Sequence, residues 1–385
     1  MNDLDLNEEN KVVFLKLKKE DAQYFIEFLK ENFDRVSIID QRYKTEQEKN
    51  YKLFPLIERK NIHDILVKKI RNHISVELIT KKGILNPNFK YRTLEEALNG
   101  KIPPIYVNLI PSSYDVIGSV AILEFEKPDQ INNKDFIDYK CLVANAVIDV
   151  NKNVKSVFEK KSEIKGSYRL RDLVYLSGEN KTETIHRENN CVFHLDIKTT
   201  FFSPRLVYER RRISESYIHE NEVIIDMFTG VGPFSIQIAK LKHVEIHAFD
   251  LNPNAIEFLK KNIYSNQLKG TIFPYNMNIR DLLNPTNQIG KKMKNNIDRI
   301  IMNLPEKSID FIDVACFLMR KSGGVLHFYK ISDKPDPENR TVKLLKKMLN
   351  KFEWDIDKVL DSKIVKSYSP KADLVAIDLD IKYLS

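Results

Sequence analysis

The sequence predicts an α/β fold whose C-terminal half is a doubly wound, mostly parallel sheet. Short apolar runs alternate there with amphipathic segments, the pattern of buried strands joined by crossover helices. One run ends at Asp226 and turns on Gly230 and Gly232 into a helical segment. The next run ends at Asp250, about 20 residues after the first glycine. Because an acid at that distance commonly binds a ribose hydroxyl, we expect a nucleoside cofactor at this turn.

The C-terminal half contains the clearest alternation of elements. The expected strands are 223–226, 245–250, 271–275, 299–303 and 325–330, and the expected helices are a segment ending at Leu241, 254–266, 311–321 and 340–352. The last two strands, 364–368 and 374–381, are joined by a turn too short to hold a crossover helix. We therefore expect these two strands to pair antiparallel.

With 385 residues, the chain is long enough for two or three domains with separate cores. We expect a small α+β domain at 1–110, a middle α+β domain at 112–201 and the doubly wound domain at 202–385. The stretch 101–113 contains three prolines and is the expected linker between the first two domains.

The elements expected in the first domain are a strand at 11–17, a helix that begins after Asp21, strands at 36–39 and 52–57, a helix at 61–72, and a helix opened by the capping pair Thr93 and Glu96. Those expected in the middle domain are a turn leading into a strand within 114–125, a helix at 136–148, and strands at 154–159 and 192–197. The block 166–189 between the last two strands carries more charged and polar groups than a simple connection needs.

Composition limits the classes of partner and site. Lys and Arg total 62 against 54 Asp and Glu, a mild basic excess that suits a polyanion without identifying one. The three cysteines form no CxxC or Cys/His cluster, so we expect neither a disulfide framework nor a structural zinc site. No apolar run approaches 18 residues and no leader pattern opens the chain, which predicts no membrane contact and a cytoplasmic protein. A role for Mg²⁺ is compatible with the sequence, although no motif indicates one.

The glycine turn lacks the features of two common nucleotide sites. A dehydrogenase fingerprint would have a third glycine where Ser235 stands, and the lysine of a phosphate-binding loop is absent. Two glycines, the acids Asp226 and Asp250, and a terminal antiparallel hairpin instead indicate an S-adenosylmethionine-dependent methyltransferase sheet. Asn303, followed closely by Pro305, ends the fourth parallel strand, where open α/β sheets bind ligands. Its amide group and the stiffening proline suit a planar, nitrogen-bearing acceptor.

Six segments together resemble the archaeal and eukaryotic tRNA (guanine-37-N1)-methyltransferases: SGENKTETIHRENN, FFSPRLVYERRRI, DMFTGVGPF, AFDLNPNAIE, IMNLPEKS and VKSYSP. The resemblance is collinear from about Ser113 to the C-terminus. It is weaker over the first 110 residues, where the family has a small domain that docks on tRNA. The resemblance implies a Rossmann-like class I methyltransferase domain, S-adenosylmethionine as cofactor, tRNA as partner and a monomeric enzyme.

The resemblance also implies roles for single residues. Glu209 is expected to remove the N1 proton of guanine, Arg169 to stabilise the charge on O6 and Asn303 to orient the base, with Pro305 shaping its pocket. Without the resemblance, Glu209 would pass as an ion-paired residue on a solvated helix face. The residues expected to bind the cofactor are Phe201, Arg205, Asp226, Phe228, Gly230, Gly232, Asp250, Leu251, Asn278 and Asn303. The basic residues expected to contact tRNA phosphates are Arg171, Arg187, Arg205, Arg210, Arg211 and Arg212.

Two positions differ from the family pattern. Phe201 stands where the family often has tyrosine, so stacking is retained but a phenol hydrogen bond is not. Asn278 replaces an acid usual beside the adenine, and its carbonyl can still accept from the adenine amino group. His186 is expected to be structural, and Trp354 to lie in the core.

Three other functions stay open. One is methylation of a wyosine-type tricyclic base at the same tRNA position, alone or as a second activity. Another is transfer of the aminocarboxypropyl group of the same cofactor. The third is tRNA binding without catalysis, which Glu209, Arg169 and Asn303 together disfavour because a pure binder has no use for a base.

Overall fold

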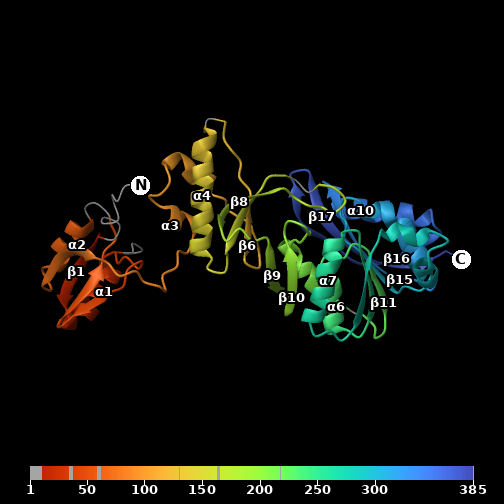
Figure 1. Ribbon diagram of the computed structural model, residues 1–385, viewed down its shortest axis with the longest axis horizontal. Helices are drawn as coiled ribbons and strands as arrows, with labels where there is room; N and C mark the ends of the chain where they lie inside the picture. The colour runs from red at the N-terminus through yellow and green to blue at the C-terminus, as the bar shows by residue number, and fades with distance from the viewer. Residues whose placement is uncertain are drawn as a thin grey trace. The chain divides into compact units, whose positions relative to one another are not determined.

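The structure of the protein is a computed structural model that describes residues 11–384 except 34–37, 59–61, 130, 163, 164 and 217. The chain forms two compact units, Met1–Glu96 and Ala97–Ser385 (Figure 1). The finer division into three domains remains a prediction.

The first unit is an antiparallel sheet with strand order β2-β3-β1-β4. Its elements are β1 (Lys11–Lys18), η1 (Lys19–Asp21), α1 (Ala22–Asn32), β2 (Glu46–Glu48), β3 (Tyr51–Pro55), α2 (Ile62–Ile70) and β4 (Val76–Lys82). Leu15 and Leu17 of β1 pack against Phe25 of α1 and Leu66 of α2, so both helices cover the same face of the sheet. The predicted strands 11–17 and 52–57 and the helix after Asp21 are confirmed. The helix predicted at 61–72 is confirmed as α2, which ends at Ile70, before a turn at residues 71 and 72.

Two strands of this unit were not predicted. β2 has only three residues, and charged side chains at Glu77, Lys81 and Lys82 mask the apolar alternation of the edge strand β4. In the predicted strand 36–39, residues 36 and 37 lie outside the described residues. The helix α3 (Leu94–Leu98) begins as predicted, because Thr93 Oγ1 accepts a hydrogen bond of 3.2 Å from the Glu96 amide.

The second unit opens with a four-stranded sheet of order β5-β6-β7-β8, on which α4 packs, and a separate hairpin of β9 and β10. The elements are η2 (Pro104–Leu109), β5 (Asp115–Ile117), β6 (Val120–Leu123), α4 (Asn133–Val150), β7 (Ser156–Lys160), β8 (Leu173–Gly178), β9 (Glu183–Glu188) and β10 (Cys191–Asp196). The expected helix at 136–148 and the strands at 154–159 and 192–197 are confirmed. The turn expected before the strand in 114–125 is itself a strand, β5, which pairs with β6.

Two segments without predicted elements, 101–113 and 166–189, are ordered parts of the second unit. In the expected linker 101–113, Tyr106 is buried and its ring stacks on Tyr139 of α4 at 4.7 Å, so this segment packs within the second unit. The polar block 166–189 contains β8 and β9. These strands escaped prediction because most of their side chains remain partly or fully exposed, which removes the apolar runs that mark buried strands.

The main sheet has seven strands in the order β13-β12-β11-β14-β15-β17-β16. Its strands are β11 (Val223–Asp226), β12 (Glu245–Asp250), β13 (Thr271–Asn276), β14 (Arg299–Met302), β15 (Gly324–Asp333), β16 (Trp354–Ser369) and β17 (Ala372–Tyr383). The helices are η3 (Pro204–Leu206), α5 (Val207–Glu215), α6 (Pro233–Leu241), α7 (Pro253–Ser265), η4 (Ile279–Leu283), α8 (Gln288–Met293), η5 (Ser308–Phe311), α9 (Ile312–Leu318) and α10 (Pro337–Asn350). The five strands from β13 to β15 in this order are parallel. β17 is antiparallel to β16, as predicted, and it also pairs antiparallel with β15.

Neighbouring residues on the central strands face opposite layers. Ile224 packs in one apolar cluster with residues of α5, α6 and α7, whereas Ile225 packs in another with residues of α9 and α10. This is the doubly wound arrangement, with α6 and α7 labelled over one face in Figure 1. Trp354 is buried in the second cluster, as expected. Among the described residues, no helix is long and apolar enough to cross a membrane.

Candidate active site

The glycine turn after β11 depends on backbone shapes that other residues rarely adopt. Gly230 and Gly232 have φ angles of +55° and +87°. A Cβ atom on Gly232 would lie 2.4 Å from Leu259 Cδ1, so the turn also packs closely on α7. The Gly230 amide donates a 2.7 Å hydrogen bond to Asp250 Oδ2, which joins the turn to the end of β12.

A cavity of about 270 Å³ lies beside this turn, at the carboxyl ends of the parallel strands. Eight residues predicted for the site line it: Arg169, Phe201, Phe228, Gly230, Asp250, Leu251, Asn278 and Asn303. The chain therefore brings together residues from the middle region and from the ends of four strands, which is where α/β sheets bind nucleoside ligands.

Asp250 combines burial with strong backbone contacts. Its Oδ1 accepts from the Asn252 amide at 2.8 Å, and its Oδ2 accepts from Gly230. Burial raises the pKa of this carboxyl above its ordinary value, although the two backbone hydrogen bonds oppose that shift. These bonds fix the orientation of the carboxylate, which suits binding of a ribose hydroxyl.

Asn303 follows β14 in a loop held from within. Ser308 Oγ donates to the Met302 carbonyl and accepts from the Leu304 amide, each at 3.0 Å. The Oδ1 atom of Asn303 is buried and has no hydrogen-bond partner. Because an unpaired buried acceptor costs roughly 1–3 kcal/mol, this atom is well suited to accept from a bound ligand.

Arg169 reaches the same cavity from the polar block. Its guanidinium lies over the Phe201 ring, with Cζ 4.8 Å from the ring centre, and its Nη1 is 3.3 Å from Glu306 Oε2. That Nη1 atom is buried without a properly aligned hydrogen bond. Burial lowers the pKa of the guanidinium from its ordinary value, but arginine stays charged in proteins. The cavity thus holds a cationic donor with unused capacity.

Aromatic side chains form another wall. The rings of Phe228 and Phe311 meet edge to face with centres 5.0 Å apart, and the Arg280 guanidinium lies over Phe311. Asn278 Oδ1 accepts from the Arg280 amide at 3.0 Å, which fixes the side chain that was expected beside the adenine. Other lining residues were not predicted: Thr229, Asn252, Met277, Lys307 and Phe311. Lys307 lies within the IMNLPEKS segment, four residues after Asn303. This closeness in sequence to a predicted site residue could have indicated that Lys307 lines the cavity.

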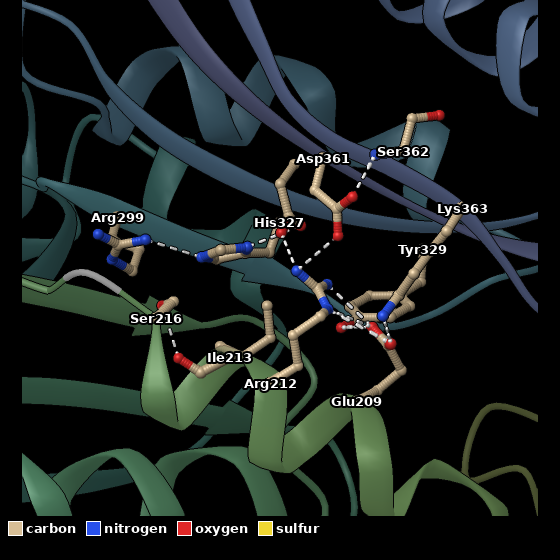
Figure 2. Close-up of polar contacts among 11 residues, drawn as sticks. Glu209, Arg212, Ile213, Ser216, Arg299, His327, Tyr329, Asp361, Ser362 and Lys363 are labelled. Carbon is tan, nitrogen blue, oxygen red and sulfur yellow. Dashed lines mark hydrogen bonds and ion pairs between the residues drawn. The ribbon is translucent and has the colours of Figure 1, made fainter.

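Glu209 does not line the cavity. It is buried on α5, where Arg212 Nη2 lies 2.9 Å from its Oε2 and the Tyr329 hydroxyl donates to the same oxygen at 3.2 Å. Lys363 Nζ contacts Oε1 (Figure 2). The alternative reading, an ion-paired residue on a solvated helix face, fits only in its ion pairs, since Glu209 is buried and both its oxygens are bound by protein groups.

Other predicted residues also lie away from the cavity lining. Asp226 is 1% exposed, and Ser235 Oγ donates to its Oδ2 at 2.8 Å. Gly232 and Pro305 shape the turn and the loop without lining the cavity. Arg205 pairs with Asp115 at 2.7 Å.

The basic residues fall into different environments. Arg210 was expected at phosphates, but it is 1% exposed and bound to Glu188, so we assign it a structural role, although it also lines the cavity. Arg212 is held by Glu209 and two aspartates. Arg211 forms an exposed pair with Glu215, and Arg187 is exposed.

A second cavity, of about 520 Å³, is lined by Arg171, Arg205 and Lys366. The Nε atom of Arg171 is buried without a hydrogen-bond partner. Burial, followed by the charge of Arg205, lowers the pKa of Lys366.

His186 accepts from the Gly118 amide at 3.1 Å and contacts Glu188, as expected for a structural histidine.

Asp226 provides a pH-dependent test of the buried turn. Burial raises the pKa of its carboxyl from 3.8 to about 6, so the folded protein binds this proton more tightly than the unfolded chain does. The folded state then loses stability as the pH rises from about 4 to 6, and the penalty persists above pH 6. We compare the free energy of unfolding of Asp226→Asn with that of the wild type at pH 4 and at pH 8. We expect this difference, variant minus wild type, to be about 3 kcal/mol larger at pH 8 than at pH 4. Urea unfolding without cofactor at both pH values measures this, and a constant difference would contradict it.

Comparison with known proteins covers nearly the whole chain. Residues 184–357 match the TRM5/TYW2 methyltransferase domain, and residues 94–182 match the TYW2 N-terminal domain. The chain is 34% identical to the tRNA (guanine(37)-N(1))-methyltransferase Trm5b of Pyrococcus abyssi, over 93% of this chain and 96% of the relative. It is 36% identical to Trm5b of Methanocaldococcus jannaschii, over 95% and 98%. The solved complex of aTrm5 and tRNALeu has a TM-score of 0.69 at 35% identity, over 96% of this chain and 99% of that chain.

Relatives with other reactions match a smaller share of the chain. A tRNA 4-demethylwyosine(37)-methyltransferase, Taw21 of Saccharolobus solfataricus, is 31% identical over 56% of this chain and 76% of the relative. An aminocarboxypropyltransferase acting on 4-demethylwyosine in tRNA(Phe), from Pyrococcus horikoshii, is 28% identical over 75% of this chain and 96% of the relative.

Proposed function

Because the chain belongs to the TRM5/TYW2 methyltransferase family, we propose that it methylates N1 of guanosine 37 in tRNA. It is an S-adenosylmethionine-dependent tRNA methyltransferase of that family. The two Trm5b relatives match it over almost their full lengths, whereas Taw21 matches just over half of it. We further propose that it acts as a cytoplasmic monomer.

The observation that carries the proposal is a pair of polar atoms in one cavity that lack hydrogen-bond partners, one of which, Arg169 Nη1, lies at ion-pair distance from Glu306. Asn303 Oδ1 is an acceptor, and Arg169 Nη1 is a donor; both are buried without a hydrogen-bond partner. Guanine presents N–H donors at N1 and N2 beside an acceptor at O6. This arrangement supports a guanine whose donor edge faces Asn303 and whose O6 faces Arg169.

The cofactor would be held on the other side of the same cavity. Asp250 would bind the ribose, Phe228 and Asn278 would contact the adenosine, and Gly230 would allow its close approach. S-adenosylmethionine, when bound, supplies an electrophilic methyl group. Guanine N1 carries a proton at neutral pH, so methylation there needs a base and a donor for the charge that develops on O6. We assign these tasks to Glu209 and Arg169.

The target base must leave the anticodon stack to enter a cavity of this kind. Arg171 and Arg187 are proposed to contact the tRNA backbone, since the first has a buried, unpaired Nε and the second is exposed. Arg205 is proposed to contact both a tRNA phosphate and the cofactor. Methylation of a wyosine-type base is the second candidate function, favoured by the 31% identity to Taw21.

Two labels on the cofactor separate these reactions. We expect methyl label to enter a transcript with G37 but not one with A37, and carboxyl label of the methionine portion to enter neither. Carboxyl label in the RNA would indicate aminocarboxypropyl transfer and overturn the proposal. Methyl transfer only to tRNA that already carries 4-demethylwyosine would establish the second function instead.

A further inference from the structure

We propose that Lys363 is a positioning residue that holds Glu209 behind the wall of the cavity, so that the base reaches its substrate only when this ion pair opens. The inference rests on the proposed function, because it concerns the residue assigned as the base. Two observations support it: the contacts that hold the Glu209 carboxylate, and the number of other acids that Arg212 and Lys363 would still bind if this carboxylate moved.

Two side chains, Tyr329 and then Phe234, connect the Glu209 carboxylate to the cavity. Its Oε2 accepts from the hydroxyl of Tyr329, which is fully buried. The Tyr329 ring contacts Phe234 with centres 5.7 Å apart, and Phe234 lines the cavity. Burial and the neighbouring Glu209 raise the pKa of Tyr329 well above 10, so its hydroxyl keeps its proton and donates. Glu209 must therefore turn away from Tyr329 to contact a base in the cavity.

The two cations bound to Glu209 are not equivalent (Figure 2). Arg212 also binds Asp361 at 3.2 Å and makes a shorter contact with Asp378, so it keeps two acids if Glu209 leaves. Asp378 is held in turn, because His327 Nδ1 lies 2.8 Å from it. Among the described residues, Glu209 is the one acid within ion-pair distance of Lys363. If Glu209 moved away, Lys363 would have no ion-pair partner among the described residues, whereas Arg212 would keep two. Lys363 is therefore the cation that opposes movement of Glu209 toward the cavity.

Lys363 is also the partner that an incoming tRNA can reach. Its side chain is 35% exposed, whereas that of Glu209 is 4% exposed. A polyanion at the surface of β16 offers phosphate oxygens as alternative acceptors for the ammonium group. Such a contact would free Glu209 Oε1 when the substrate arrives, while Arg212 stays in place. The pair would thus keep the base out of the cavity until RNA is bound.

The test compares single-turnover methyl transfer to a G37 transcript by the wild type, Lys363→Met, Lys363→Arg and Lys358→Met. Lys358 is a matched control, an exposed lysine on the same strand with no contact to Glu209. Loss of one partly exposed ion pair is expected to raise the chemical rate constant of Lys363→Met about three- to tenfold. Lys363→Arg should restore the wild-type rate constant. Lys358→Met should leave the rate constant unchanged.

An unchanged or lower rate constant for folded Lys363→Met would overturn the inference, and thermal unfolding establishes that the variant is folded. A rise of the same size in Lys358→Met would also overturn it, because the effect would then come from general surface charge. The proposed function fails separately: in that case the wild type itself would not methylate the G37 transcript.

Discussion

Glu209→Gln is expected to slow methyl transfer in a single turnover by about 10²–10⁴-fold, the range that a positioned general base contributes. Glutamine keeps the size of the side chain but cannot take the N1 proton. The affinity for S-adenosylmethionine should change little, because Glu209 does not line the cavity that would hold the cofactor. Rapid-quench kinetics with labelled cofactor and calorimetric titration of the cofactor measure the two quantities.

Glu215→Gln is the control for this variant. Glu215 lies on the same helix and forms an exposed pair with Arg211, so its substitution should leave the rate constant unchanged. Folding should survive Glu209→Gln, since Arg212 keeps its contacts with Asp361 and Asp378. A wild-type rate constant for Glu209→Gln would reject this residue as the base.

Arg210→Met is expected to destabilise the fold by about 3–5 kcal/mol, the cost of removing one partner of a buried ion pair. Arg210 Nε and Nη2 donate to the two oxygens of Glu188 at 2.5 and 2.6 Å, and both residues are buried. Burial raises the pKa of the Glu188 carboxyl, but hydrogen bonds from His186 and Arg210 outweigh it and hold the pKa below its ordinary value. This stabilisation is present above the unfolded-state pKa of about 4.5 and is lost as the pH falls through the folded-state pKa.

Urea unfolding at pH 7 measures the loss, with Arg211→Met as the neighbouring control. Because Arg211 and Glu215 form an exposed pair, that control should lose no more than about 0.5 kcal/mol. If Arg210→Met were as stable as Arg211→Met and instead reduced the salt dependence of tRNA binding, Arg210 would be a phosphate contact after all.

The main sheet could be predicted because its strands are buried on both faces. Ile224 and Ile225 belong to different apolar clusters, so β11 is a continuous apolar run in the sequence. The strands β8 and β9 could not be predicted in this way, since most of their side chains are partly or fully exposed. β16 extends well beyond the predicted 364–368, because four register shifts and many charged residues interrupt its alternation.

The site was predictable where its residues follow strand ends. Asp250 and Asn303 come directly after or at the end of parallel strands, so the fold alone places both at one edge of the sheet. Arg169 and Glu209 were identified through the family resemblance. The position of Glu209 behind the cavity wall was not predictable, because it depends on Tyr329, 120 residues later in the chain, and on Lys363 of the terminal hairpin.

The most direct measurement is the identity of the nucleoside produced in a G37 transcript. The product of a reaction with S-adenosylmethionine is digested to nucleosides and separated by chromatography with mass detection, and primer extension locates the modified position. Removal of the N1 proton beside Asn303 and Arg169 predicts 1-methylguanosine at position 37 and a block to primer extension there. A methyl group on N2 or N7, or at another position of the tRNA, would contradict the account.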